Sequence, residues 1–239
     1  MFAPYFDQAY GLQGWDLQPR TRVIPVAASD SGTLSLELVW QLEQMLSAQG
    51  HPVEVVDSLR GLDTRAAASG HVAVLQRWLR GIPQGSVVVL HAPMEALAVL
   101  LADSTARPLV AMGADRRAVV QAYNTIKVLV QVGELEPVVV PMGDTDQARA
   151  LSKAARALRD ACEHRLDTSV SVWPLEYHEN NIKDTRLSPQ ETCMLKVLDS
   201  ALVLDTTVVH MEPPTRPTTR MPRQDQPLGA ADVHRQRHA

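Results

Sequence analysis

Short apolar segments alternate with amphipathic segments along most of the chain. The apolar segments, such as 22–28 (RVIPVAA) and 86–91 (SVVVLH), contain few charged residues, although Pro25 is unusual in a central strand. The segments between them place apolar residues three and four positions apart, as in 34–48, which is the spacing of one helix face. Apolar strands that alternate with such helices are typical of a parallel sheet covered on both faces. The pattern therefore predicts an α/β fold.

The predicted elements continue in this order to about residue 204. The last is an amphipathic helix in which Leu195, Leu198 and Leu202 share one face. We expect this face to pack on the sheet, and contact with a membrane or a partner is the less favoured interpretation. The predicted strands are 22–28, 52–57, 86–91, 107–113, 136–143 and 168–175, and the predicted helices are 34–48, 66–80, 94–102, 115–132, 145–165 and 188–204.

The composition changes towards the C-terminus. Segment 206–239 is rich in proline and poor in large apolar residues, so it cannot bury enough surface to fold, and we predict a disordered tail. From Pro213 onward it holds five arginines and two aspartates. A solvated tail is favoured over one that attracts an anionic partner or a membrane surface. The rest of the 239-residue chain is long enough for one α/β domain, which we assign to residues 21–205.

Charge and cysteine content exclude several classes of protein. The net charge is −4 and the isoelectric point is near 6.1, which argues against a protein that coats nucleic acid. Cys162 and Cys193 lie far apart and outside any metal-binding motif, so neither a zinc site nor a disulfide framework is expected. No apolar run approaches the roughly 18 residues that span a bilayer, and the N-terminus has no signal-peptide pattern. We therefore expect a soluble, cytoplasmic protein.

The loop after the first strand has the position of a phosphate-binding loop but lacks its chemistry. In α/β proteins this turn holds phosphate through glycine backbone N–H groups and the N-terminus of the following helix. Here the turn reads SDSGTLSL, with Gly32 as its one glycine, no lysine, and the negative charge of Asp30. A carboxylate beside phosphate is unfavourable. We therefore do not expect a nucleotide to be held in the usual way.

Four segments carry a resemblance to a known family, namely DQAYGL at 7–12, RVIPVAASDSGTLSLEL at 22–38, GHPVEVVD at 50–57 and DRRAVVQAYNTIKVL at 115–129. Together they resemble the MinD/ParA class of deviant Walker ATPases, and most closely the flagellar number regulators of the FlhG (FleN) type. The resemblance runs from about residue 5 to 200 and implies a three-layer, doubly wound, mostly parallel sheet like that of P-loop NTPases.

The resemblance also identifies the positions that handle nucleotide in this class. The deviant lysine falls on Asp30, the phosphate-binding lysine on Ser35, and the Mg²⁺-binding Ser/Thr on Leu36. The aspartate that begins the phosphate-sensing switch falls on His91, and of these positions only Asp57 keeps its acidic residue. The resemblance therefore implies a pseudo-ATPase with a degenerate nucleotide site, no catalytic residues, no cofactor and no metal. An ATP-dependent dimer is not expected either.

The N-terminal segment 1–20 retains a motif with a chemical role. Asp7, Gln8, Ala9 and Leu12 match the family's DQAxxLR activator segment, which docks on the signal-recognition-type GTPase FlhF, although Gln13 replaces the arginine. A glutamine that orients the attacking water is a recurring part of GTP hydrolysis. The resemblance thus implies a partner-binding segment, and the alternative is a leader that folds back on the domain.

Three functions remain open at this point. The first is a non-catalytic regulator of flagellar placement or number that binds the flagellar GTPase through residues 5–13. The second is a MinD/ParA-like scaffold for another polar or envelope machine, such as polysaccharide secretion, pilus assembly or division-site selection. The third is an ATPase with an unconventional nucleotide site. In the first two, partners would recruit the protein to the cell pole or the inner membrane.

Overall fold

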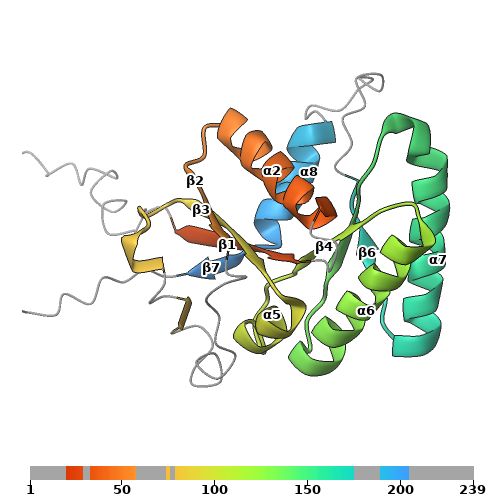
Figure 1. Ribbon diagram of the computed structural model, residues 1–239. Helices are drawn as coiled ribbons and strands as arrows, with labels where there is room; N and C mark the ends of the chain where they lie inside the picture. Colours follow the sequence, from red (N-terminus) through yellow and green to blue (C-terminus); the bar gives the residue numbers. More distant parts are fainter. Residues whose placement is uncertain (1–19, 29–32, 58–73, 76–78, 175–188, 205–239) are drawn as a thin grey trace, which may run out of the picture. The chain divides into compact units, whose positions relative to one another are not determined.

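The structure is a computed structural model that describes residues 20–28, 33–57, 74–75, 79–174 and 189–204 (Figure 1). Within these residues the strands form one sheet in the order β2-β3-β1-β4-β5-β6, and a further strand, β7, pairs with β1. Strands β1 to β6 are parallel and β7 is antiparallel. The strands are β1 (Thr21–Ala27), β2 (Val53–Asp57), β3 (Val87–Ala92), β4 (Leu109–Met112), β5 (Val138–Pro141), β6 (Ser171–Val172) and β7 (Leu202–Leu204).

Helices cover both faces of the sheet, which confirms the predicted α/β fold (Figure 1). Helices α2 and α8 pack on one face, while α5, α6 and α7 pack on the other. The α-helices are α2 (Thr33–Ala48), α5 (Met94–Leu100), α6 (Arg116–Gly133), α7 (Ala148–Leu166) and α8 (Pro189–Asp199), and the 3₁₀ helices are η1 (Leu79–Gly81) and η2 (Thr145–Gln147). Of the predicted helix over 66–80, the structure describes Val74 and Leu75, which are helical, and the start of η1.

The strand β1 is apolar throughout because both of its faces are covered. Ile24 and Val26 belong to the core under α2 and α8, whereas Val23 and Ala27 belong to the core under α5, α6 and α7. These four side chains are at most 3% exposed. The absence of polar alternation in the sequence thus reflects burial on two sides.

Pro25 is tolerated within β1 because, on one side of β1, two different strands pair with its two ends. On one side β1 pairs with β3 along its length, and Arg22 and Ala28 donate backbone N–H groups to that side. The N–H groups alternate in direction along a strand, so position 25 faces the other side. There β7 pairs with 21–23 and β4 with 26–27, and Pro25 lies between these two ladders. The missing N–H therefore interrupts neither ladder.

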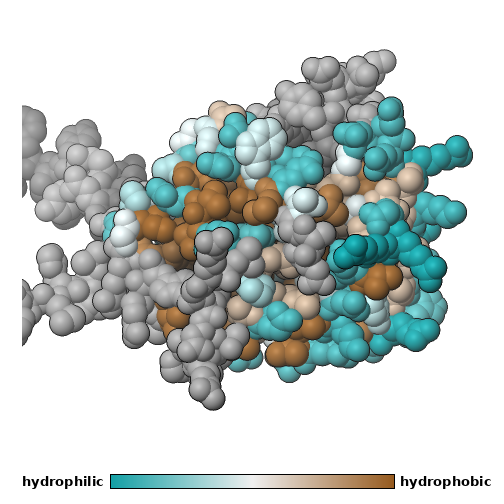
Figure 2. Space-filling model, viewed as in Figure 1, coloured by the Kyte–Doolittle hydropathy of each residue, from teal (hydrophilic) through white to brown (hydrophobic). Residues whose placement is uncertain are grey.

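The amphipathic pattern of α7 is that of a helix on the outside of the sheet. Its buried residues, Leu151, Ala155, Leu158 and Cys162, recur at spacings of three and four. Figure 2 shows hydrophilic residues gathered over the outer surfaces of α6 and α7. In the described part of the chain, no helix is both long enough and apolar enough to span a membrane.

The prediction of one helix over 188–204 is wrong, because α8 ends at Asp199. The Arg22 guanidinium donates to the Leu198 carbonyl at 2.8 Å, and the Arg107 backbone N–H donates to the Ser200 carbonyl at 2.9 Å. These bonds satisfy carbonyl groups at the C-terminal end of the helix. The chain then reverses into β7, which pairs with residues 21–23 of β1.

The predicted apolar face of this segment is divided by the turn. Leu198 is buried on the α2 side of the sheet, whereas Leu202 is buried on the α5 side. Leu195 is 45% exposed. These three leucines therefore do not form a shared face that packs on the sheet.

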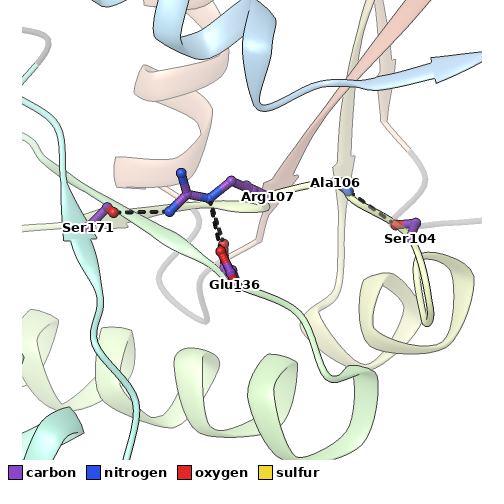
Figure 3. A network of polar contacts seen from close by, with 5 residues as sticks. All are labelled: Ser104, Ala106, Arg107, Glu136 and Ser171. Atoms are coloured by element: carbon purple, nitrogen blue, oxygen red, sulfur yellow. Dashed lines mark hydrogen bonds and ion pairs between the residues drawn. The ribbon is translucent and has the colours of Figure 1, made fainter.

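A polar network at the amino-terminal ends of β4, β5 and β6 fixes their alignment (Figure 3). The Arg107 guanidinium donates to Ser171 Oγ at 3.0 Å and to the Glu136 backbone carbonyl at 3.4 Å, and lies 3.8 Å from the Glu136 carboxylate. It also lies 5.4 Å from the centre of the Trp173 ring. Since the two charged side chains are partly exposed, the ion pair contributes at most about 1 kcal/mol, and the main role of Arg107 is to link three strands.

Candidate functional site

Three of the residues that the family resemblance assigns to the nucleotide site, Ser35, Asp57 and His91, lie together at the carboxyl ends of the central strands. The parallel register sets Asp57 at the end of β2 beside His91 of β3, and His91 beside Val26 of β1. Ser35 lies in the first turn of α2, the helix that follows β1. Residues more than 50 positions apart in the sequence, such as Ser35 and His91, are thereby brought within hydrogen-bonding distance.

His91 connects the other two side chains. Its Nε2 lies 3.1 Å from Ser35 Oγ, and its Nδ1 lies 3.4 Å from Asp57 Oδ1. An ionised carboxylate can only accept, so in the neutral imidazole the proton belongs on Nδ1, and the Ser35 hydroxyl donates to Nε2. His91 is 1% exposed and Ser35 is fully buried, whereas the Asp57 side chain is 54% exposed.

The order of atoms is that of a serine–histidine–aspartate triad, but the exposures are reversed. In a hydrolytic triad the serine oxygen faces the substrate and the aspartate is buried behind the histidine. Here the serine is buried and Asp57 faces solvent. The arrangement therefore does not offer Ser35 as a nucleophile, and its evident role is to tie α2 to β2 and β3.

The remaining predicted residues are distributed differently. Leu36 is 49% exposed, and it lies on the face of α2 opposite the buried residues Leu38 and Leu42. It therefore does not join the group formed by Ser35, Asp57 and His91. The other predicted site residues lie outside the described residues, and these are Asp7, Gln8, Ala9, Leu12, Asp30 and Gly32.

A crevice at the same edge of the sheet was not predicted. It has a volume of about 750 Å³ and lies between the first turns of α2 and α6 and the segment after β5. Helix α2 follows β1 on one face, and α6 follows β4 on the other, so the crevice lies where the crossover connections diverge. The sequence signal was a repeated Met-Gly pair at the ends of two predicted strands, Met112-Gly113 and Met142-Gly143.

Gly113 keeps this edge compact. A Cβ atom at position 113 would lie 3.1 Å from the Ala118 Cβ and 3.2 Å from the Leu34 Cδ1. Helix α6 begins just beyond this glycine, and its N-cap Asp115 accepts a hydrogen bond from the Ala118 backbone N–H at 2.9 Å. Glycine at the end of β4 thus allows α2 and α6 to begin side by side.

Metal and thiol chemistry have no support among the described residues. No group of three or more His, Cys, Asp and Glu side chains in the described ranges could hold a metal ion. Burial raises the pKa of the Cys162 thiol from 9.0 to about 11, and burial also raises the pKa of Cys193. Burial therefore disfavours the thiolate, the reactive form, at both cysteines.

Comparison with known proteins gives no family assignment. Neither a scan against protein-family models nor a search of curated proteins returned a match to this chain.

Proposed function

We propose that the protein is a non-catalytic, MinD/ParA-like regulator whose nucleotide site has become a structural contact. The observation that carries the proposal is the hydrogen bond between Ser35 Oγ and His91 Nε2. These residues stand at the predicted positions of the phosphate-binding lysine and the switch aspartate. At the two positions that contact nucleotide in an active relative, the side chains of this protein instead bond to each other in the core.

The electrostatics of this group also disfavour polyphosphate. An active site needs positive charge and a metal ligand to offset the charge of the β- and γ-phosphates. Ser35 offers a neutral hydroxyl, and Leu36 offers no oxygen at the position of the metal ligand. Asp57 adds a partly exposed negative charge beside His91. Phosphate would meet repulsion here rather than compensation.

With nucleotide chemistry removed, the remaining activity is assigned to the N-terminal segment. On this proposal, residues 5–13 bind a flagellar GTPase of the signal-recognition type and thereby regulate flagellar placement or number. Gln8 would help to orient the attacking water in the partner's GTP site, as glutamine does in other GTPases. The α/β domain would then act as a fixed carrier for this segment.

The full-length chain with Gln8→Ala tests the proposal. We expect the wild-type protein to stimulate GTP hydrolysis by the partner, and Gln8→Ala to reduce the stimulation about tenfold or more, because the water is no longer oriented. Single-turnover GTP hydrolysis measures the rate.

Gln18→Ala is the matched control, since it removes a glutamine from the same segment outside the motif. It should behave as the wild type. Equal stimulation by wild type and Gln8→Ala would refute the role of Gln8, and absence of any complex with the GTPase would leave the scaffold for another polar or envelope machine as the better function.

A further inference from the structure

The outer surfaces of α6 and of the first turns of α7 carry cations and no carboxylate. Segments 116–133 and 148–159 contain seven Arg and Lys residues and neither Asp nor Glu. Arg117 lines the crevice described above, and the other six are exposed on the outside of the two helices. These six, which we call the basic face, are Arg116 and Lys127 on α6 and Arg149, Lys153, Arg156 and Arg159 on α7. Because α6 and α7 pack against each other on one side of the sheet, the six cations share one side of the domain (Figure 1).

The cations of the basic face are not neutralised by neighbouring carboxylates. In the part of the chain that the structure describes, none of the six side chains forms an ion pair. Protein surfaces usually intersperse charges of both signs. Without these six residues, 17 of the 23 basic residues would remain against 27 acidic ones, and the net charge would fall from −4 to −10. A concentration of positive charge on an otherwise acidic chain points to an anionic partner.

The spacing on α7 aligns three of these cations. Arg149, Lys153 and Arg156 recur at intervals of four and three residues, so they lie on one side of the helix. The buried residues Leu151 and Leu158 lie on the opposite side. Since a helix rises about 1.5 Å per residue, this row of cations is about 10 Å long. A short extended segment with several carboxylates could therefore contact all three at once.

The apolar residues around these cations disfavour nucleic acid and membrane as the partner. Tyr123 is the one aromatic residue of the two helices, and it packs against the core. Single-stranded nucleic acid usually stacks on exposed aromatic side chains, and a helix that lies in a membrane surface inserts residues such as Trp, Phe and Leu. The exposed large hydrophobic residues of α6 and α7 within the described ranges are Val120 and Val132. Neither kind of contact is therefore provided.

Acidic protein segments fit the chemistry better. Four of the six cations are arginines, and the planar guanidinium group binds carboxylates through paired hydrogen bonds. A short acidic segment can also contact the basic face without approaching the acidic remainder of the chain. A long polyanion would meet both.

We infer that the basic face binds an acidic segment of a partner protein. The inference is independent of the proposed regulatory function, because it rests on the outer surfaces of α6 and α7 and not on the N-terminal segment or the nucleotide-site positions.

Fluorescence anisotropy of a labelled oligoglutamate peptide, titrated with the full-length protein, tests the inference. We expect binding that the triple variant Arg149→Gln, Lys153→Gln, Arg156→Gln weakens about tenfold or more, because three exposed charge pairs are lost together. Glutamine is a good helix former and the three positions are exposed, so α7 should remain folded, which circular dichroism checks. An oligothymidylate of the same length and vesicles containing phosphatidylserine should bind more weakly than the peptide.

The matched control is the triple variant Arg216→Gln, Arg220→Gln, Arg223→Gln, which removes the same charge from the C-terminal segment. It should bind the peptide as the wild type does. Absence of peptide binding would overturn the inference, and so would equal weakening in the two triple variants, which would indicate general attraction to a polyanion. Tighter binding of the oligothymidylate or of the vesicles would also overturn it, because the basic face would then belong to nucleic acid or to a membrane surface.

Discussion

At the scale of single residues, Ser35, Asp57 and His91, three of the positions that the register predicts for the nucleotide site, lie within hydrogen-bonding distance of one another through His91. The grouping was predictable because the end of each parallel strand, and the start of the helix after β1, meet at one edge of the sheet. The hydrogen bonds were not predictable, since they depend on side-chain directions that only packing determines. Leu36 follows Ser35 in α2 and therefore points to a different side of the helix, away from this group.

Ser35→Ala tests the contribution of this contact to stability. The substitution removes the hydroxyl that donates to His91 Nε2, and we expect the free energy of unfolding to fall by about 1 kcal/mol. Urea denaturation followed by circular dichroism gives the value. Ser47→Ala is the control, because Ser47 is an exposed residue in the last turn of the same helix and should change the stability by less than about 0.5 kcal/mol. Equal effects would mean that the Ser35–His91 bond contributes nothing.

At the scale of elements, the strands and helices of the parallel sheet were predictable from apolar runs and helix stripes, and the C-terminal segment was not. Leu202 to Leu204 form too short an apolar run to distinguish a strand from the continuation of a helix. The end of α8 depends on Arg22, which lies 176 residues away from Leu198. Such long-range contacts leave no local signal in the sequence.

Close packing of α5 against α6 gives a prediction at this scale. A Cβ atom at Gly133 would lie 2.7 Å from the Ala98 backbone oxygen, so Gly133→Ala forces the two helices apart. We expect a loss of about 1–3 kcal/mol in the free energy of unfolding, although alanine is the better helix former.

Gly81→Ala is the matched control for this measurement. Among the described residues, nothing other than its own chain neighbours lies within 4 Å of the position that its Cβ would take, so thermal or urea unfolding should show almost no change. A Gly133→Ala protein as stable as the wild type would contradict the close approach of α5 and α6.

At the scale of the whole domain, the class of fold was predictable, but the order of the strands and the crevice at their carboxyl ends were not. Alternating strands and helices specify a sheet covered on two faces, whereas the order β2-β3-β1-β4-β5-β6 depends on pairings between distant segments. The described walls of the crevice come from three such segments, so its position follows from the strand order. From the sequence we predicted a loop without phosphate-binding chemistry, and the sequence did not indicate the crevice beside α2 and α6.

The central claim is that the site which would hold nucleotide now forms a contact within the core. Isothermal titration of the full-length protein with Mg-ATP tests it most directly, with an active ATPase of the MinD/ParA class as the positive control in the same buffer. We expect no measurable binding, because Ser35 and His91 bond to each other and the sequence 29–36 holds no lysine to compensate the phosphates. Micromolar binding of Mg-ATP would contradict the account and establish a working nucleotide site.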